Sequence, residues 1–181
     1  MATPSPSSNP LARLSDTFLG PLLDACRVDF VPAEPQPSWP RWVVATVVAL
    51  AGSLAADAAL ATLGKKVFPA TVGFAHFQVT SYAKLTVIGV IGACVGWPIV
   101  TRLSSQPRWL FLRLAVAVTV VLLAPDAWIW IRGESAEGIL VLVLMHLAIA
   151  VITYNALVRI APAGGARPVS IGAGRRPGSR G

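Results

Sequence analysis

Residues 138–159 read GILVLVLMHLAIAVITYNALVR, and the only acidic or basic side chains in this run are His146 and the terminal Arg159. A run of about 20 apolar residues is long enough to cross a hydrocarbon core of roughly 30 Å. Three further runs of this kind lie at 42–64, 83–103 and 109–131. Because lipid offers no hydrogen-bond partner to backbone groups, each run must form a helix. The sequence therefore predicts an all-α membrane protein with a four-helix transmembrane bundle.

The composition supports this class and excludes an ordinary soluble domain. Of the 181 residues, 55% are apolar and only 13% are charged, and the mean hydropathy is +0.67. A typical soluble domain has about 25% charged residues. Tryptophans at positions 39, 42, 109, 128 and 130 frame the apolar runs, as expected for side chains that anchor helix ends at the membrane interface.

The net charge of +7 is better explained by membrane topology than by nucleic-acid binding, because the arginines form no stripe with interleaved aromatic residues. If the four helices alternate in direction, eleven lysines and arginines fall on one side and four on the other. The first group is Arg13, Arg27, Arg41, Arg102, Arg108, Arg113, Arg159, Arg167, Arg175, Arg176 and Arg180; the second is Lys65, Lys66, Lys84 and Arg132. We therefore expect a multi-pass plasma-membrane protein with both termini in the cytoplasm.

Two polar tails flank the transmembrane domain, which we place at 41–160. Residues 1–40 are rich in proline and poor in apolar side chains, which predicts a flexible cytoplasmic segment. Within it, the apolar spacing between Leu11 and Cys26 fits either a short amphipathic helix on the membrane surface or a transient turn. Residues 161–181 are rich in glycine, proline and arginine and are expected to be a basic disordered tail.

Three ionisable side chains lie within the predicted spans: Asp57, Asp126 and His146. With alternating helices all three fall in the outer half of the bilayer, where they can meet. Each also shares a helical face with a hydroxyl-bearing residue. These hydroxyl residues are Ser53, Thr119 and Thr153.

This predicted polar network has two interpretations. Ionisable groups in lipid are costly and often functional, so the three side chains could form a proton relay or a cation site. Alternatively, they form a hydrogen-bonded packing network in which the two aspartates lie close enough to the interface to be hydrated. The second interpretation is favoured by the sequence, because a relay needs polar continuity to both surfaces and the inner half offers few polar groups.

Small residues give the second span a different character. Gly89, Gly92 and Gly96 lie on one helical face, and Gly92 and Gly96 have the GxxxG spacing that permits close helix contact. Such a face packs either within the bundle or between protomers. Since Ala45, Ala49 and Ser53 repeat at intervals of four in the first span, we expect the first two spans to pack on each other.

Two segments resemble a known family. The end of the third span, LLAPDAW, and the fourth span, LVLMHLAIAVITYNALVR, are similar to small actinobacterial membrane proteins grouped as domain of unknown function 6069. In that family a Pro-Asp, a Met-His pair and a polar residue of the first span recur, and here Pro125, Asp126, Met145, His146 and Asp57 occupy those places. The resemblance covers about residues 42–160. It implies a membrane topology but no particular activity.

No catalytic motif accompanies these features: the sequence has no phosphate loop, no GxSxG, no HExxH and no CxxC pair. We therefore expect no enzymatic activity, no cofactor and no bound metal. The favoured expectation is an accessory or interaction module whose partners are lipid, further copies of the chain or other membrane proteins. The alternative is a small proton- or cation-coupled transporter, and a lipid-modifying enzyme is a weaker third.

Overall fold

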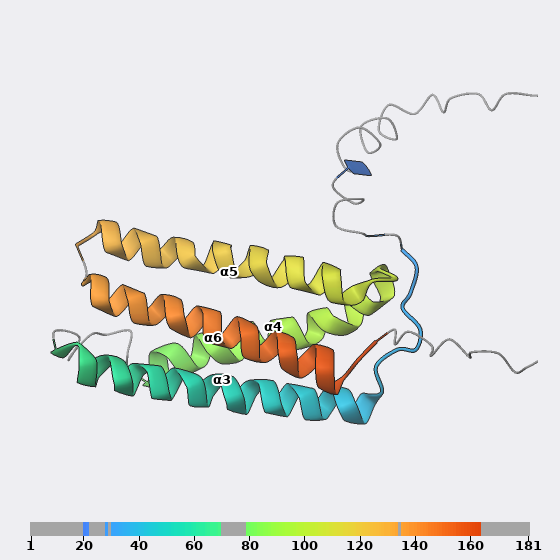
Figure 1. Ribbon diagram of the computed structural model, residues 1–181, viewed down its shortest axis with the longest axis horizontal. Helices are drawn as coiled ribbons and strands as arrows, with labels where there is room; N and C mark the ends of the chain where they lie inside the picture. The colour runs from blue at the N-terminus through green and yellow to red at the C-terminus, as the bar shows by residue number, and fades with distance from the viewer. Residues whose placement is uncertain (1–19, 22–27, 29, 70–78, 134, 164–181) are drawn as a thin grey trace, which may run out of the picture.

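Four membrane-spanning helices make up nearly all of the structure (Figure 1), a computed structural model that describes residues 20–21, 28, 30–69, 79–133 and 135–163. The helices are α3 (Trp39–Val67), α4 (Val79–Leu103), α5 (Pro107–Ile131) and α6 (Ala136–Ile160). Each is long and apolar enough to cross a bilayer. The predicted all-α, four-helix transmembrane fold is therefore confirmed.

Most of the helices extend a few residues beyond the predicted apolar runs, into flanking prolines and polar residues. Pro40 lies in the first turn of α3, where its missing N–H is not needed, and Lys65 and Lys66 complement the negative end of the helix. The α6 helix begins where the Ser135 Oγ accepts a hydrogen bond from the Gly138 N–H at 3.2 Å.

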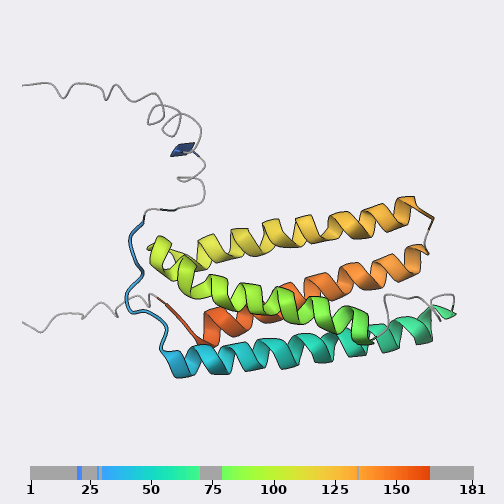
Figure 2. The same cartoon turned by 180° about the vertical axis from the view of Figure 1, so that it is seen from behind.

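Successive helices alternate in direction, and α6 contacts each of the other three (Figure 1). Its most extensive contact is with α3, where a stripe of small and polar residues recurs almost every four positions. The buried stripe of α3 is Ala45, Ala49, Ser53, Asp57, Ala61 and Gly64. Seen from behind, α4 lies across the bundle between α3 and α5 (Figure 2). The prediction that this stripe packs on the second span is thus incomplete, since α6 is its main partner.

Most large apolar side chains point away from the bundle, as the bilayer requires. Leu85 and Ile88 of α4 and Val120 and Val121 of α5 are exposed by more than 60%. In water such a surface would be strongly unfavourable, whereas in lipid it costs nothing. The exposed apolar surface is therefore further support for a multi-pass membrane protein.

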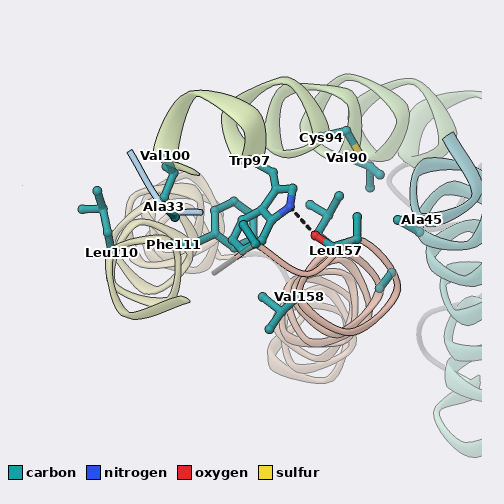
Figure 3. Close-up of a cluster of buried hydrophobic side chains, with 14 residues drawn as sticks. Ala33, Ala45, Val90, Cys94, Trp97, Val100, Leu110, Phe111, Leu157 and Val158 are labelled. Carbon is teal, nitrogen blue, oxygen red and sulfur yellow. Dashed lines mark hydrogen bonds between the residues drawn. The ribbon is translucent and has the colours of Figure 1, made fainter. Parts of the chain in front are cut away.

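Two apolar clusters form the interior. The larger surrounds Trp97 at the end where α3 begins (Figure 3), and Trp97 packs edge-on against Phe111 with ring centroids 5.1 Å apart. The smaller cluster, at the opposite end, consists of Ala61, Val141, Leu142 and Met145. Along α3, Ser53 and Asp57 lie between Ala49 of the first cluster and Ala61 of the second. A polar layer therefore separates the two clusters.

Residues next to both ends of the transmembrane domain pack on the bundle. The Ala33 N–H donates to the Thr101 carbonyl at 2.8 Å, and the Gln36 side chain bonds both to that carbonyl and to the Thr101 hydroxyl. These bonds use carbonyls at the end of α4 that lack a donor within their own helix. Beyond the C-terminal end of α6, the Ala161 carbonyl accepts from Trp97 Nε1 at 2.9 Å.

The remaining tail predictions concern residues that the structure does not describe. The apolar spacing between Leu11 and Cys26 lies almost entirely outside the described residues, as does the basic segment 164–181.

Candidate functional site

The polar layer is centred on a contact between α5 and α6. His146 Nδ1 lies 3.2 Å from Asp126 Oδ2, so an imidazole and a carboxylate form an ion pair if the imidazole is protonated. The Asp126 side chain is 8% exposed and that of His146 is 26% exposed. Pro125 lies within α5 directly before Asp126, and its missing N–H leaves a carbonyl one turn back without its usual donor. The structure thus brings together two of the three predicted ionisable residues.

The surroundings of His146 fix which of its two ring nitrogens carries hydrogen. The same Nδ1 lies 2.9 Å from the Leu142 carbonyl oxygen, an atom that can only accept. A hydrogen bond there requires Nδ1 to be the N–H, and the Asp126 carboxylate lies beside the same nitrogen at 3.2 Å. In the neutral ring the second nitrogen, Nε2, then carries the lone pair.

Asp57 is the third ionisable member and is completely buried. Its Oδ2 accepts a hydrogen bond of 2.5 Å from the Thr86 hydroxyl of α4, while Oδ1 has no hydrogen-bond partner among the described residues. His146 is close enough to interact with Asp57 electrostatically. A carboxylate without contact to water requires such compensation, since an isolated buried charge is very costly. Asp57 of α3 thus lies near the contact that joins Asp126 of α5 to His146 of α6.

Thr86 was not among the residues that the sequence predicted for this site. The signal that would have found it is positional, because Thr86 is a polar residue in the outer half of the second span, at a depth similar to that of Asp57. In the structure Thr86 is 4% exposed and points into the bundle.

Ser53 and Thr153 continue the polar layer towards the end where α3 begins. Both side chains are buried, and neither hydroxyl has a hydrogen-bond partner in the part of the chain that the structure describes. This is unusual, because the hydroxyls of Thr46, Thr62 and Thr119 all donate to a carbonyl four residues back in their own helices.

The depths of Ser53 and Thr153 follow from the packing of α3 against α6. A Cβ on Gly52 would lie 3.0 Å from Ile152 Cγ2, so these two residues face each other. Ser53 and Thr153 are the next residues along two antiparallel helices and lie at nearly the same depth. Asp57 is one turn, or about 6 Å, further along α3. The unpartnered oxygens of Ser53, Thr153 and Asp57 thus extend over about one helical turn on one side of the Asp126–His146 pair.

Thr119, also predicted for the network, is not joined to it. Its hydroxyl donates to the Ala115 carbonyl at 2.7 Å, which satisfies it within α5. It lies seven residues, or about 10 Å along the helix, from Asp126.

The predicted packing face of the second span is placed differently from the expectation. Gly89 and Gly92 are exposed and Gly96 is half-buried, and a Cβ at any of the three would have no neighbour within 4 Å. The buried face of α4 instead carries Val90, Cys94 and Trp97. Large side chains gain more from burial than glycines do, and the Trp97 N–H needs the internal acceptor that it finds on Ala161.

The chemistry of the site suits protons better than transition metals. Over the described ranges no three His, Cys, Asp or Glu side chains are grouped as metal ligands. The ion pair, the hydrogen-bonded carboxylate and the unpartnered hydroxyls are all groups that bind protons, water or small oxygen-seeking cations.

Comparison with known families places the chain in one of them. A family of unknown function, DUF6069, matches residues 35–163. The chain belongs to this family. The matched range covers all four helices of this DUF6069 protein and begins at residue 35, four residues before α3. No curated protein and no solved structure matches the chain.

Proposed function

We propose that this DUF6069 protein binds and releases protons inside the bilayer at His146, Asp126 and Asp57, as the coupling site of a small proton-linked transporter. The observation that carries the proposal is the contact of His146 with Asp126 beside a fully buried Asp57. Ionisable residues on three separate helices converge there, within spans that otherwise bury apolar side chains. Such residues in a membrane interior mark proton or ion pathways more often than structural contacts.

The charge of the site explains why proton binding would be coupled to helix packing. With His146 protonated and both aspartates ionised, the three groups carry a net charge of −1, and loss of the imidazole proton makes this −2. In a low-dielectric interior each uncompensated charge is expensive. Binding of a further proton by one of the aspartates makes the site neutral and draws α3, α5 and α6 together, whereas loss of the imidazole proton favours separation or hydration. Ser53 and Thr153 offer oxygens to the water that would enter.

A proton-flux measurement tests this proposal. The full chain is reconstituted in vesicles that contain a pH-sensitive dye, and an imposed pH gradient drives proton entry. We expect dye acidification above that of empty vesicles, and its loss in Asp126→Asn, His146→Ala and Asp57→Asn. Thr119→Val is the matched control, because Thr119 is a polar residue of α5 outside the site and should leave the flux unchanged.

Two results would contradict the proposal. One is wild-type flux that equals that of empty vesicles at every gradient and in the presence of each candidate co-substrate. The other is flux that persists in the Asp126→Asn and His146→Ala variants.

A second candidate function is that of an interaction module that self-associates through α4. The observation in its favour is that Gly89, Gly92 and Gly96 line an outward face with open space above each glycine. A second copy of the same helix could approach this face closely, as in other GxxxG contacts. Crosslinking in native membranes tests it: Gly92→Leu should abolish a dimer, whereas Ala117→Leu on the exposed face of α5 should not. A chain that stays monomeric at every protein-to-lipid ratio would contradict it.

The location and orientation also belong to the proposal. We infer a plasma-membrane location with both termini in the cytoplasm, supported by the excess of basic residues at the end where α3 begins. Among the described residues Arg41, Arg102, Arg108, Arg113 and Arg159 lie at or near that end. The opposite end has Lys65, Lys66, Lys84 and Arg132, which makes the asymmetry modest within the bundle and larger when the two tails are added.

A further inference from the structure

A groove at the basic end of the bundle lies outside the proton site and has a lining of mixed chemistry. It has a volume of about 400 Å³ and lies between the first turns of α3 and the last turn of α6. Pro40, Arg41 and Val44 line it from α3, and Arg159 and Ile160 line it from α6. The groove is thus formed by two helices that are more than 90 residues apart in sequence.

The polar part of this groove is positively charged and uncompensated. Arg41 and Arg159 come from different helices, and neither guanidinium has an acidic partner within the described ranges. The first turn of α3 contains no acidic residue, and Ser38 provides no side-chain cap. The uncapped peptide N–H groups of that turn add to the positive potential. A planar guanidinium matches phosphate oxygens in two-point hydrogen bonds.

The apolar part of the groove fixes its depth in the membrane. Val44 is 52% exposed and continues into Val47 and Val48, which also face outward along α3. Trp39, at the start of the helix, is 70% exposed and stacks on Trp42 with ring centroids 4.9 Å apart. Exposed tryptophans at a helix end mark the headgroup region. The two arginines are therefore at the depth of lipid phosphates, with an aliphatic wall beside them at the depth of acyl chains.

We propose that Arg41 and Arg159 bind the phosphate of one anionic phospholipid, whose acyl chain lies along Val44 and Ile160. The occupant is a lipid rather than free phosphate because three of the five lining residues, Pro40, Val44 and Ile160, are apolar, and Val44 is exposed on the surface of α3 that meets lipid. The phospholipid then joins the start of α3 to the end of α6, the pair of helices with the most extensive contact. This site is independent of the proton site.

Native mass spectrometry of the full chain in detergent tests the site. Protein is mixed with phosphatidylglycerol or phosphatidylcholine, and retained lipid is counted after collisional removal of the detergent. We expect one phosphatidylglycerol to be retained in preference to phosphatidylcholine, and retention to fall about tenfold in Arg41→Gln and in Arg159→Gln, because charge-assisted hydrogen bonds to phosphate are among the strongest. The aliphatic wall is tested by Val44→Ser, which should reduce retention while leaving all charges in place.

Arg108→Gln is the matched control. Arg108 lies in the first turn of α5 at the same end of the bundle, is exposed and carries the same charge, but does not line the groove. If its replacement lowers retention as much as that of Arg41, the lipid is attracted by diffuse charge and the site is refuted. Equal retention of the two lipids also overturns it. A third result would overturn the assignment of the occupant. If millimolar inorganic phosphate displaces phosphatidylglycerol and Val44→Ser retains as much lipid as the unsubstituted chain, the site binds phosphate and not a lipid.

Discussion

At the scale of single residues, the state of His146 is the detail on which the proposed proton chemistry depends. The Leu142 carbonyl and the Asp126 carboxylate both lie within 3.2 Å of Nδ1. Hydrogen on Nδ1 satisfies the carbonyl and faces the carboxylate, whereas hydrogen on Nε2 alone would place the Nδ1 lone pair against both oxygens. The neutral side chain is therefore expected as the Nδ1–H tautomer, the less common form of a free histidine.

Nitrogen NMR of ¹⁵N-histidine-labelled protein in detergent micelles measures this tautomer. The chain has two histidines, so His76→Gln leaves one signal pair. We expect a protonated Nδ1 at high pH and protonation of Nε2 as the pH falls. Asp126→Asn should leave this tautomer in place, because the Leu142 carbonyl remains an acceptor for the Nδ1–H. A ring that already has hydrogen on Nε2 alone in the unsubstituted chain would contradict the geometry.

The hydrogen bond between Thr86 and Asp57 has a predictable effect on stability. Thr86→Val removes the donor and leaves both carboxylate oxygens of a fully buried aspartate without a hydrogen bond. We expect a loss of about 1–3 kcal/mol in the free energy of unfolding. Asp57→Asn keeps an acceptor for Thr86 and removes the buried charge, so its stability should equal or exceed that of the wild type. Denaturation in mixed micelles measures both, and a Thr86→Val protein as stable as the wild type would show that the bond contributes little.

At the scale of helices, two glycines that look alike in the sequence have opposite surroundings. Gly52 of α3 faces Ile152 so closely that a Cβ would lie 3.0 Å from Cγ2, whereas Gly92 of α4 faces open space. Gly52→Leu should therefore separate α3 from α6 and cost about 1–3 kcal/mol of stability. Gly92→Leu should leave the thermal unfolding of the monomer unchanged. Equal effects of the two substitutions on the melting temperature would contradict the packing.

The same contrast shows what the sequence could predict about helices and what it could not. The four spans were predictable to within a few residues because each segment must by itself be long and apolar enough to cross the lipid. The inward face of α4 was not predictable, because a helix that is apolar all round has faces of similar hydropathy. Trp97 and Thr86 face inward because of partners on other helices, Ala161 and Asp57. Those partners are 64 and 29 residues away.

At the scale of the whole molecule, the convergence of Asp57, Asp126 and His146 was predictable from the alternation of helix directions alone. The docking of the segment around Ala33 and Gln36 on Thr101 was not, because a proline-rich stretch carries no pattern that indicates a partner 65 residues away. Local composition therefore predicted the membrane domain well and its borders poorly. The contacts that close the basic end of the bundle all join residues distant in sequence.

The contacts at the basic end of the bundle lead to a prediction about the N-terminal segment. Gln36 bonds to both the carbonyl and the hydroxyl of Thr101, which ties residues before α3 to the last turn of α4. Gln36→Ala should release the segment and expose the peptide bond after Arg41 to added trypsin. Glu34→Ala, in the same segment but without a described bond to α4, should not.

Proteolysis in sealed vesicles also reports orientation, since the cleaved site lies on the side of the N-terminus. Cleavage only in inside-out vesicles is expected for a cytoplasmic N-terminus, and cleavage only in right-side-out vesicles would reverse the topology.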